Sequence, residues 1–379
     1  MRVYLDNAAT TPLADEVVEA MQQVMKYDFG NPSSTHYFGR RAKALIETSR
    51  RNISRTLNCH PSEIIFLSGG TEADNLAILT SVRELGVKTI ITTKIEHHAV
   101  GHTAEAVSST NSIHVEYVKI DELGNVDLTH LESILKKVGP NTLVSLMHAN
   151  NEIATLLPIK EVSRICRKYG ALFHSDTVQT MGHYSFDLED LDIDFITCAG
   201  HKLHGPKGIG FLYVNKKHKI GSLIFGGAQE RGHRGGTENL IGIVGLAKAI
   251  ELSYEDLIGH QTHVQHLKSY MIERLKNELE SVYFHGEIEP NKSLYTVLNV
   301  SLPPSTKASM LLFTLDLRGV AVSGGSACSS GSNKGSHVLD GIGANPNRPN
   351  VRFSFSRYTS QKEVDYAIDQ LKEIYRNNL

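Results

Sequence analysis

The sequence predicts an α/β fold in which helices cover both faces of a mainly parallel sheet. Short apolar runs such as 89–93 and 142–149 alternate with amphipathic stretches such as 128–138 and 159–169. This alternation is typical of repeated strand–helix–strand units. The chain has 379 residues, 40% of them hydrophobic, which is enough for two domains.

The first third of the chain begins this alternation with two helices. Leu13, Val17 and Met21 recur at helical spacing after a polar turn that ends at residue 12. The stretch 30–36 reads Gly-Asn-Pro-Ser-Ser-Thr-His, which is loop composition, and a second helix is expected to follow it. Strands are then expected at 63–67, 89–93, 113–120, 142–149 and 171–175, with helices between them.

A lysine lies in a tight hairpin between two later strands. The run 194–199 is expected to enter the turn as a strand, and 208–214 to leave it. Lys202 lies between them, in a turn that Gly205 and Pro206 make rigid. A lysine held near another cation, or away from water, loses its proton more easily and can form a Schiff base. The alternative is an ordinary solvated loop lysine.

A strand-to-helix turn, Gly69-Gly70-Thr71, follows the strand 63–67. The first N–H groups of a helix and its dipole both favour an anion at such a turn, and glycine lets a phosphate approach the backbone. The turn is not a P-loop, because the Gly-Lys-Ser/Thr ending is missing. The alternative is an ordinary turn in which Thr71 caps the helix.

Polar side chains follow other expected strands directly. They are His97, Asn151, Asp176 and Gln179. The carboxyl ends of parallel strands meet at one edge of a sheet, where ligands bind. A histidine there can serve in acid–base steps, and a buried aspartate needs a cationic partner. The alternatives are a surface histidine and a structural ion pair.

Two glycine-rich segments lie further along the chain. Residues 226–239 are also rich in arginine and are either a flexible connection or a second anion-binding segment. They open a helix that is expected to run to about residue 280, with a domain boundary near residue 260. Residues 323–336 have linker composition but contain Cys328. Because an exposed mobile thiol is easily oxidised, a cysteine in such a segment is expected to have a function.

Charge and cysteine content exclude several classes of function. Lys+Arg 39 and Asp+Glu 41 give a net charge of −2, so nothing favours nucleic acid or an anionic membrane as a partner. No apolar run reaches the ~18 residues of a membrane helix. The cysteines at 59, 166, 198 and 328 lie far apart, without the spacing of a zinc site or a disulfide framework. We therefore expect no bound metal and a reducing, cytoplasmic location.

Together these features match what pyridoxal 5'-phosphate needs: a Schiff-base lysine, an acid for the pyridine nitrogen, a phosphate-binding turn and a stacking ring. Ordered motifs cover nearly the whole chain, at 5–12, 30–34, 68–72, 96–97, 148–152, 174–176, 200–210, 234–237, 326–331 and 351–354. With them the chain resembles the class I cysteine desulfurases of the nitrogen-fixation and iron–sulfur-cluster assembly type. These are fold type I enzymes, which are aspartate-aminotransferase-like.

The resemblance implies the domain organisation. A large cofactor-binding domain at 13–260 would be built on a mainly parallel seven-stranded sheet. A smaller α+β domain would combine residues 1–12 with 261–379 and carry the loop of the catalytic Cys328. The segment that ends in Thr237 resembles one that crosses the subunit interface in this family, which implies a homodimer with composite sites.

The resemblance also implies a role for each site residue. Lys202 would hold the cofactor and move the α-proton, Asp176 would pair with the pyridine nitrogen, and His97 would stack on the ring and act in acid–base steps. The cofactor-binding set is Gly70, Thr71, His97, Asn151, Asp176, Gln179, His201, Lys202 and, from the partner subunit, Thr237. The substrate-binding set is Arg352, Asn151 and Asn31.

The implied reaction converts L-cysteine to L-alanine and leaves a persulfide on Cys328. The sulfur would then pass to an iron–sulfur scaffold or another acceptor protein, for cluster or thio-cofactor assembly. Ala199 departs from the family pattern, in which a serine usually binds the cofactor phosphate, and losing that bond costs on the order of 1 kcal/mol. The alternatives are a selenocysteine lyase or other aminotransferase-like enzyme of the same fold, and a non-catalytic scaffold for iron–sulfur assembly.

Overall fold

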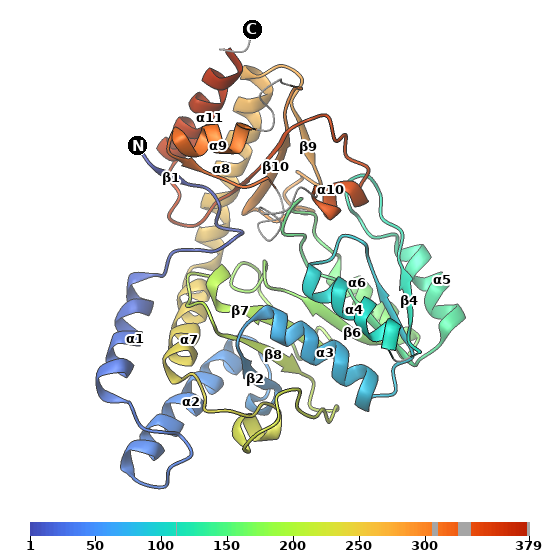
Figure 1. The fold of residues 1–379 in the computed structure, drawn as a ribbon, viewed down its shortest axis with the longest axis vertical. Coiled ribbons are helices and arrows are strands. Elements are labelled where there is room, and N and C mark those ends of the chain that lie inside the picture. Colours follow the sequence, from blue (N-terminus) through green and yellow to red (C-terminus); the bar gives the residue numbers. More distant parts are fainter. Residues whose placement is uncertain (111, 305–309, 325–334, 377–379) are drawn as a thin grey trace.

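The computed structural model describes residues 1–110, 112–304, 310–324 and 335–376, which fall into two parts (Figure 1). The larger part, in the lower half of Figure 1, holds a central sheet between helices. The smaller part contains the last third of the chain together with its first strand, so both termini lie there.

The larger part is built on a seven-stranded sheet of order β2-β8-β7-β6-β5-β3-β4. Its strands are β2 (Ile64–Leu67), β3 (Thr89–Thr92), β4 (His114–Tyr117), β5 (Thr142–Ser145), β6 (Leu172–Asp176), β7 (Phe195–Ala199) and β8 (Gly210–Val214). Neighbours from β4 to β7 are parallel, whereas β8 runs antiparallel to both β7 and β2. Strand β8 returns directly through the Lys202 hairpin, and a direct return forces antiparallel pairing. The predicted, mainly parallel seven-stranded sheet is confirmed.

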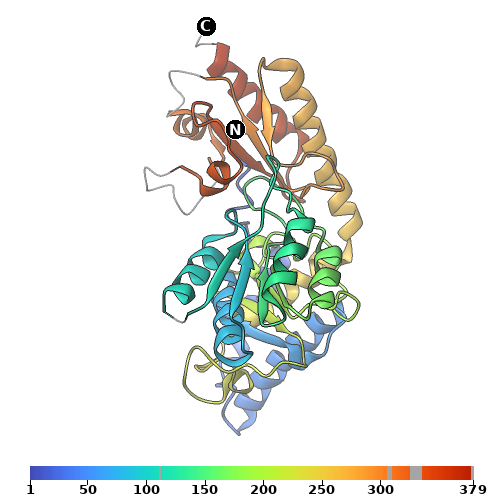
Figure 2. The same cartoon turned by 90° about the vertical axis from the view of Figure 1, so that its right-hand side faces the viewer.

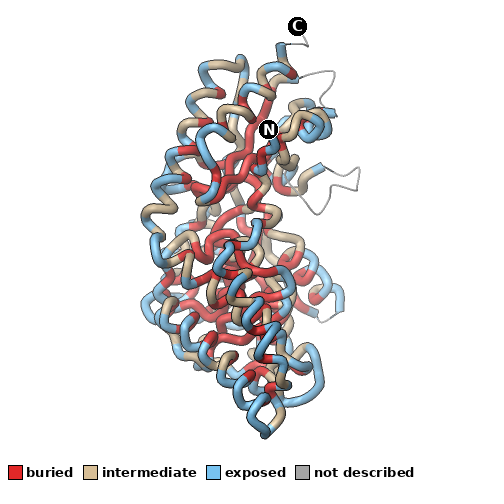
Figure 3. The backbone as a smooth tube through the Cα atoms, turned by 90° about the vertical axis from the view of Figure 1, so that its left-hand side faces the viewer, coloured by how far each residue is buried: buried red, intermediate tan, exposed pale blue. Residues whose placement is uncertain are grey.

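Helices cover both faces of this sheet because its strands are apolar on both. Along β2, Ile64 and Phe66 belong to one hydrophobic core, and Ile65 and Leu67 to another. The first core is completed by α1 (Asp15–Tyr27), α2 (Tyr37–Thr56), α5 (Leu128–Val138), α6 (Ile159–Lys168) and α7 (Leu240–Glu255). The second is completed by α3 (Gly70–Glu84) and α4 (His98–Thr110). Buried backbone therefore runs through the middle of the larger part (Figure 3).

The smaller part combines an antiparallel sheet of order β12-β10-β9 with a parallel pair, β1–β11. Its strands are β1 (Val3–Tyr4), β9 (Tyr283–His285), β10 (Val297–Ser301), β11 (Val320–Ala321) and β12 (Asn350–Ser354), and its helices are α8 (Leu257–Glu278), α9 (Leu311–Leu317), α10 (His337–Gly341) and α11 (Gln361–Arg376). One core joins Val3 and Leu5 to α8 and α11. Among the described residues, no helix is both long and apolar enough to cross a membrane.

The prediction of a single long helix up to about residue 280 is wrong, because the structure has two helices there. Asp256 has φ −134° and ψ 52°, which is not helical, and its carboxylate accepts a hydrogen bond from Gly259 N at 3.1 Å. This side chain ends α7 and caps α8. Helix α7 packs in the larger part, and α8 extends from there into the smaller part (Figure 2). The domain limits at 12/13 and 260/261 stay a prediction.

A buried ion pair ties the 226–239 segment to the larger part. Arg50 donates to both carboxylate oxygens of Glu230, in η3 (Gln229–Gly232), at 2.8 Å each. Glu230 also accepts from Phe66 N at 2.8 Å, and the Arg50 guanidinium lies 4.6 Å from the Phe66 ring centroid. Glu230 has φ 44°, a left-handed conformation that non-glycine residues rarely adopt. The ion pair therefore holds this loop in a shape that its sequence does not favour.

We predict that Arg50→Ala lowers the free energy of unfolding by about 3–5 kcal/mol, because it leaves the Glu230 carboxylate buried without its cationic partner. Urea denaturation followed by circular dichroism would measure the loss. Arg51, the next residue on α2, is exposed, so Arg51→Ala is the matched control and should cost less than about 0.5 kcal/mol. Equal losses in the two variants would contradict the assignment.

Candidate active site

A pocket of about 260 Å³ lies where the larger and smaller parts meet. Its walls come from the carboxyl ends of β6 and β7, the starts of α3 and α4, and residues of the N-terminal segment, α10 and β12. The predicted site residues that line it are Gly70, Thr71, His97, Asn151, Asp176, Gln179, His201, Lys202 and Arg352. Side chains from distant parts of the sequence thus meet at the sheet edge where ligands are expected.

Lys202 is held by the N-terminal segment of the chain. It ends η2 (Gly200–Lys202), inside the hairpin between β7 and β8. Its Nζ donates to the carbonyl oxygens of Ala8 and, at 2.8 Å, Ala9. The hairpin is tied to the same segment by Thr11, whose hydroxyl accepts from His204 N at 2.8 Å. The rigid hairpin that the sequence predicts is therefore present, and the first residues of the chain help to fix it.

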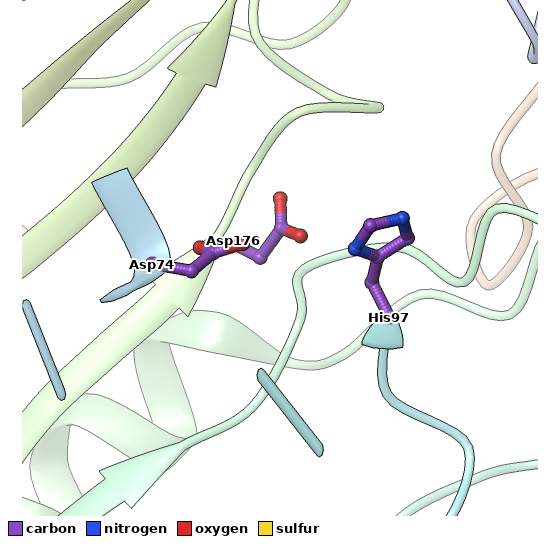
Figure 4. A group of neighbouring side chains, drawn as sticks. All are labelled: Asp74, His97 and Asp176. Atoms are coloured by element: carbon purple, nitrogen blue, oxygen red, sulfur yellow. The ribbon is translucent and has the colours of Figure 1, made fainter. Parts of the chain in front are cut away.

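Two buried carboxylates lie on the floor of the pocket, with an imidazole facing them (Figure 4). Asp74 is 1% exposed and Asp176 is 7% exposed, and one ligand atom from each of Asp74, Asp176 and His97 lies within 4.8 Å of the others. Burial raises the pKa of Asp74 to about 7. Burial also raises the pKa of Asp176, with Asp74 adding to the effect and His97 opposing it. These carboxylates lack a full cationic partner among the described side chains around them, so the floor favours a positively charged ligand group.

His97 is held directly before α4 as a neutral ring. Its Nδ1 accepts a hydrogen bond from Ala99 N at 3.2 Å, which places the proton of the neutral imidazole on Nε2. Burial lowers the pKa of His97, the Asp176 carboxylate opposes this, and Lys202 lowers it further. A neutral imidazole with its Nε2 proton available can therefore donate at neutral pH.

The start of α3, which also lines the pocket, is suited to an anion. Helix α3 begins at Gly70, where an added Cβ would lie 2.8 Å from Val178 Cγ2, so only glycine fits without a shift. The first N–H groups of a helix have no partner within it and attract negative charge. His201 lies beside this turn with Nδ1 3.2 Å from Thr10 Oγ1, and burial lowers its pKa to about 4, with Lys202 and Lys207 contributing.

Arg352 of β12 forms the wall from the smaller part and is 1% exposed. Its Nη1 donates to Asn151 O at 2.9 Å, and its Nη2 lies 3.0 Å from an Asp6 carboxylate oxygen. Its Nε is buried and has no hydrogen-bond partner among the residues that the structure describes. An unpartnered guanidinium N–H in a pocket wall favours binding of a carboxylate or phosphate ligand.

Among the predicted site residues that the structure describes, two do not line this pocket. Asn31 and Thr237 line a separate hollow of about 380 Å³ beside α1 and the start of α7. Thr237 was expected to act from the partner subunit, so its distance from the pocket of its own chain leaves that prediction untested. Cys328 lies outside the described residues.

Several pocket residues were missed by the sequence reasoning. They are Ala8, Ala9, Asp74, His98, Glu152 and His337. Asp74 lies on the first turn of α3, one helical turn after Thr71, and this spacing places it on the pocket side. Glu152 directly follows Asn151, and only the tertiary structure shows that it is 1% exposed.

Comparisons with known proteins agree with this geometry. The family described as aminotransferase class-V matches residues 3–367. The cysteine desulfurase IscS of Dictyoglomus turgidum is 42% identical over 380 residues, which cover 98% of this chain and 94% of the relative. A solved NifS-like protein is 38% identical with a TM-score of 0.91 and full coverage of both chains. A structure of SspA in complex with cysteine is 32% identical with a TM-score of 0.79, covering 94% of this chain and all of that one.

The fold and the pocket therefore define a class-V aminotransferase. The chain belongs to this family and, within it, to the cysteine desulfurases of the IscS and NifS type.

We predict that His174 makes the fold sensitive to acid. It is fully buried on β6, with Nδ1 2.8 Å from Ser145 Oγ and Nε2 3.1 Å from Thr197 Oγ1, and burial lowers its pKa to about 4. Between pH 6.5 and about 4, only the unfolded chain binds this proton, so stability falls as the pH falls. This histidine accounts for about 2 kcal/mol of the loss between pH 7 and 5.

Urea denaturation at pH 7 and pH 5 tests this prediction. His174→Gln should lose about 2 kcal/mol less than the unmodified protein between the two pH values. His114 is exposed, so His114→Gln is the control and should keep the full loss. An unchanged pH dependence in His174→Gln would refute the prediction.

Proposed function

We propose that this pocket uses pyridoxal 5'-phosphate to remove sulfur from L-cysteine, releasing L-alanine and leaving the sulfur on Cys328. The observation that carries the proposal is the meeting of Lys202, Asp176, His97 and Arg352 in one pocket. The cysteine desulfurase names of the relatives and the cysteine bound to SspA support the same substrate.

The donor set of the pocket fits this cofactor. A lysine amine is available for a Schiff base, a desolvated Asp176 carboxylate suits the ring N–H, and the start of α3 suits the phosphate. The glycine at 70 leaves room that a side chain would fill. When bound, pyridoxal phosphate supplies an electron sink for bonds broken at the α-carbon of an amino acid.

The predicted site residues then have the following tasks. Lys202 would hold the cofactor and later move the α-proton of the substrate at Nζ, Asp176 would keep the ring nitrogen protonated, and His97 would stack and donate from Nε2. The remaining contacts to the cofactor are expected from Gly70, Thr71, Asn151, Gln179, His201 and, from the partner subunit, Thr237. Gln179 Nε2 donates to Ala8 O at 3.0 Å, which fixes its amide at the pocket wall.

Arg352 would bind the carboxylate of L-cysteine, with Asn151 and Asn31 as further substrate contacts. Its two Nη atoms are already engaged by Asn151 O and Asp6, so the guanidinium is oriented before the substrate arrives. The buried Nε supplies an N–H for the incoming carboxylate. Orientation in advance lowers the entropy cost of binding.

Cys328 would carry the sulfur. Its thiolate attacks the sulfur of L-cysteine, the Cβ–S bond of the substrate breaks, and the carbon gains a proton and leaves as part of L-alanine. Burial raises the pKa of Cys166 and Cys198, and that of Cys59 to about 12, so none of these three thiols supplies a thiolate readily. The three are also free, which suits the reducing cytoplasm that the sequence predicts.

The active form would be a homodimer that passes sulfur to an iron–sulfur scaffold or another acceptor protein. Phe29 is 74% exposed and its ring centroid lies 5.0 Å from that of Phe38, which is also exposed. Phe29 lines the hollow that holds Asn31 and Thr237, so apolar surface adjoins the residues expected to act across the interface.

We predict that borohydride reduction of the holoenzyme fixes a pyridoxyl group on Lys202, because Lys202 is the lysine that lines the pocket among the described residues. Peptide mass spectrometry would locate the group. Lys207, in the same hairpin, is exposed, so Lys207→Ala is the control and should keep the label on Lys202. A label on Lys207 would overturn the assignment.

We predict that Cys328→Ala retains cofactor and binds L-cysteine, as seen in its visible spectrum, but releases alanine at least about 100-fold more slowly because the nucleophile is missing. Cys59→Ala is the control and should release alanine at the normal rate. Near-normal alanine release from Cys328→Ala would instead favour the selenocysteine-lyase alternative, which needs no persulfide.

A further inference from the structure

Helix α10 is held against the rim of the pocket by two loops of the larger part. Ser336 caps the helix by accepting from Leu339 N at 3.1 Å, and its hydroxyl also donates to the carboxylate of Glu152. The next residue, His337, lies with Nε2 2.8 Å from the carbonyl oxygen of Glu96 and donates to it. The start of α10 is therefore bonded to the loop after β5 and to the loop before α4.

The loop before α4 and the loop after β5 are hydrogen-bonded to each other, and together we call them the platform. Asn150 Nδ2 donates to Ile95 O at 2.8 Å, while Asn150 Oδ1 accepts from Glu152 N at 2.8 Å and from Ile153 N at 3.1 Å. Beneath the polar contacts, a small buried core consists of Ile95, Ile153, Val338 and Ile342. The platform is thus rigid on the side of the larger part, and α10 packs on it through both polar and apolar contacts.

Glu152 is buried without a task in the chemistry proposed above. Burial raises the pKa of Glu152, while the Ser336 hydroxyl, Arg352 and His337 favour its charged form. A buried carboxylate is costly unless it is hydrogen-bonded, and bonds to a charged acceptor are stronger than neutral ones. We therefore expect the hydrogen bond from Ser336 to Glu152 to stay formed in the folded chain.

The chain before the 325–334 segment is fixed on the same wall. Gly324 O accepts from Asn350 Nδ2 at 2.6 Å, and Ser323 O accepts from Arg352 N at 2.7 Å. Arg352 in turn donates to Asn151 O, next to Glu152 in sequence. Both ends of the segment that contains Cys328 are therefore attached to the wall formed by residues 151–152 and β12.

We propose that Glu152 is a positioning residue, which fixes the chain after the Cys328 segment at the pocket through Ser336. Cys328 precedes Ser336 by eight residues, so its Cα lies within about 28 Å of the Ser336 Cα in any conformation. A fixed end raises the effective concentration of the thiol at the pocket, as a short linker does for a second binding event. The proposal rests on the sulfur-carrying role of Cys328 proposed above.

A charge placed at Ser336 tests the contact. Ser336→Asp keeps a good helix N-cap but sets a second carboxylate beside Glu152. In the holoenzyme, the amides of 337–342 should exchange hydrogen about tenfold faster, and alanine release should slow by about tenfold. Cofactor content should be unchanged, and KM for L-cysteine should stay within about twofold, because neither residue is assigned to bind them.

Combining Ser336→Asp with Glu152→Gln restores the hydrogen bond with the roles exchanged, because the glutamine amide can donate to the aspartate carboxylate. The paired variant should therefore recover the slow hydrogen exchange and most of the alanine release. Ser360→Asp is the matched control. Ser360 also donates to a glutamate, Glu363, at 2.8 Å, but at the exposed start of α11. It should change neither measurement.

Three outcomes would overturn the proposal: unchanged exchange in α10 of Ser336→Asp, faster exchange without slower alanine release, or no recovery in the paired variant. The Cys328→Ala variant in the same assay shows separately whether the proposed function itself has failed. Exchange in α10 reports on the Glu152 contact even then, because it does not depend on catalysis.

Discussion

The hydrogen bonds of the Arg352 guanidinium join both parts of the chain into one pocket. Its backbone belongs to the sheet of the smaller part, whereas its side chain reaches Asp6 near the N-terminus and Asn151 after β5. A lysine ammonium also has three N–H donors, but they diverge from one nitrogen, whereas the planar guanidinium holds its donors in a fixed fork. The Asp6 contact also fixes the start of the N-terminal segment, and the Ala8 carbonyl oxygen of that segment accepts a hydrogen bond from Lys202 Nζ. The position of the Lys202 amine therefore depends on Arg352, although the two residues are far apart in sequence.

The pocket carries charged groups of both signs. Asp176 lies between Asp74 and the neutral His97 (Figure 4), and Lys202 and Arg352 line the same pocket. In water such charges would be screened, but burial makes each of them favour a ligand of opposite sign. A ligand with a cationic ring nitrogen and anionic groups around it satisfies the whole set at once. Groups held in this way need little rearrangement when the ligand binds, which is the usual source of electrostatic catalysis.

The sheet and most of the pocket could be predicted because both follow from local patterns. Strand runs with glycine or polar residues at their carboxyl ends place His97, Asp176 and Lys202 at one edge without knowledge of the fold. The break between α7 and α8 could not be predicted in this way, since an aspartate such as Asp256 also occurs on the solvated face of a continuous helix. Glu152 lies in a polar run after a strand, and its contact with Ser336, which is far away in sequence, is visible only in the tertiary structure. The assignment of Asn31 stays a prediction, since Asn31 lines a separate hollow and not the pocket of this chain.

In the proposed function, the Cys328 thiol has to serve two places. A sulfur carrier must reach the substrate inside the pocket and an acceptor outside it, which argues against a cysteine fixed on a strand or helix. A long free tail would satisfy both needs, but the entropy lost on bringing the thiol into the pocket grows with the logarithm of the chain length. Here Gly324 and Ser336 are both bonded to the body of the protein, with twelve peptide steps between them. The entropy cost of closing a connection of this length is smaller than that of closing a long free tail.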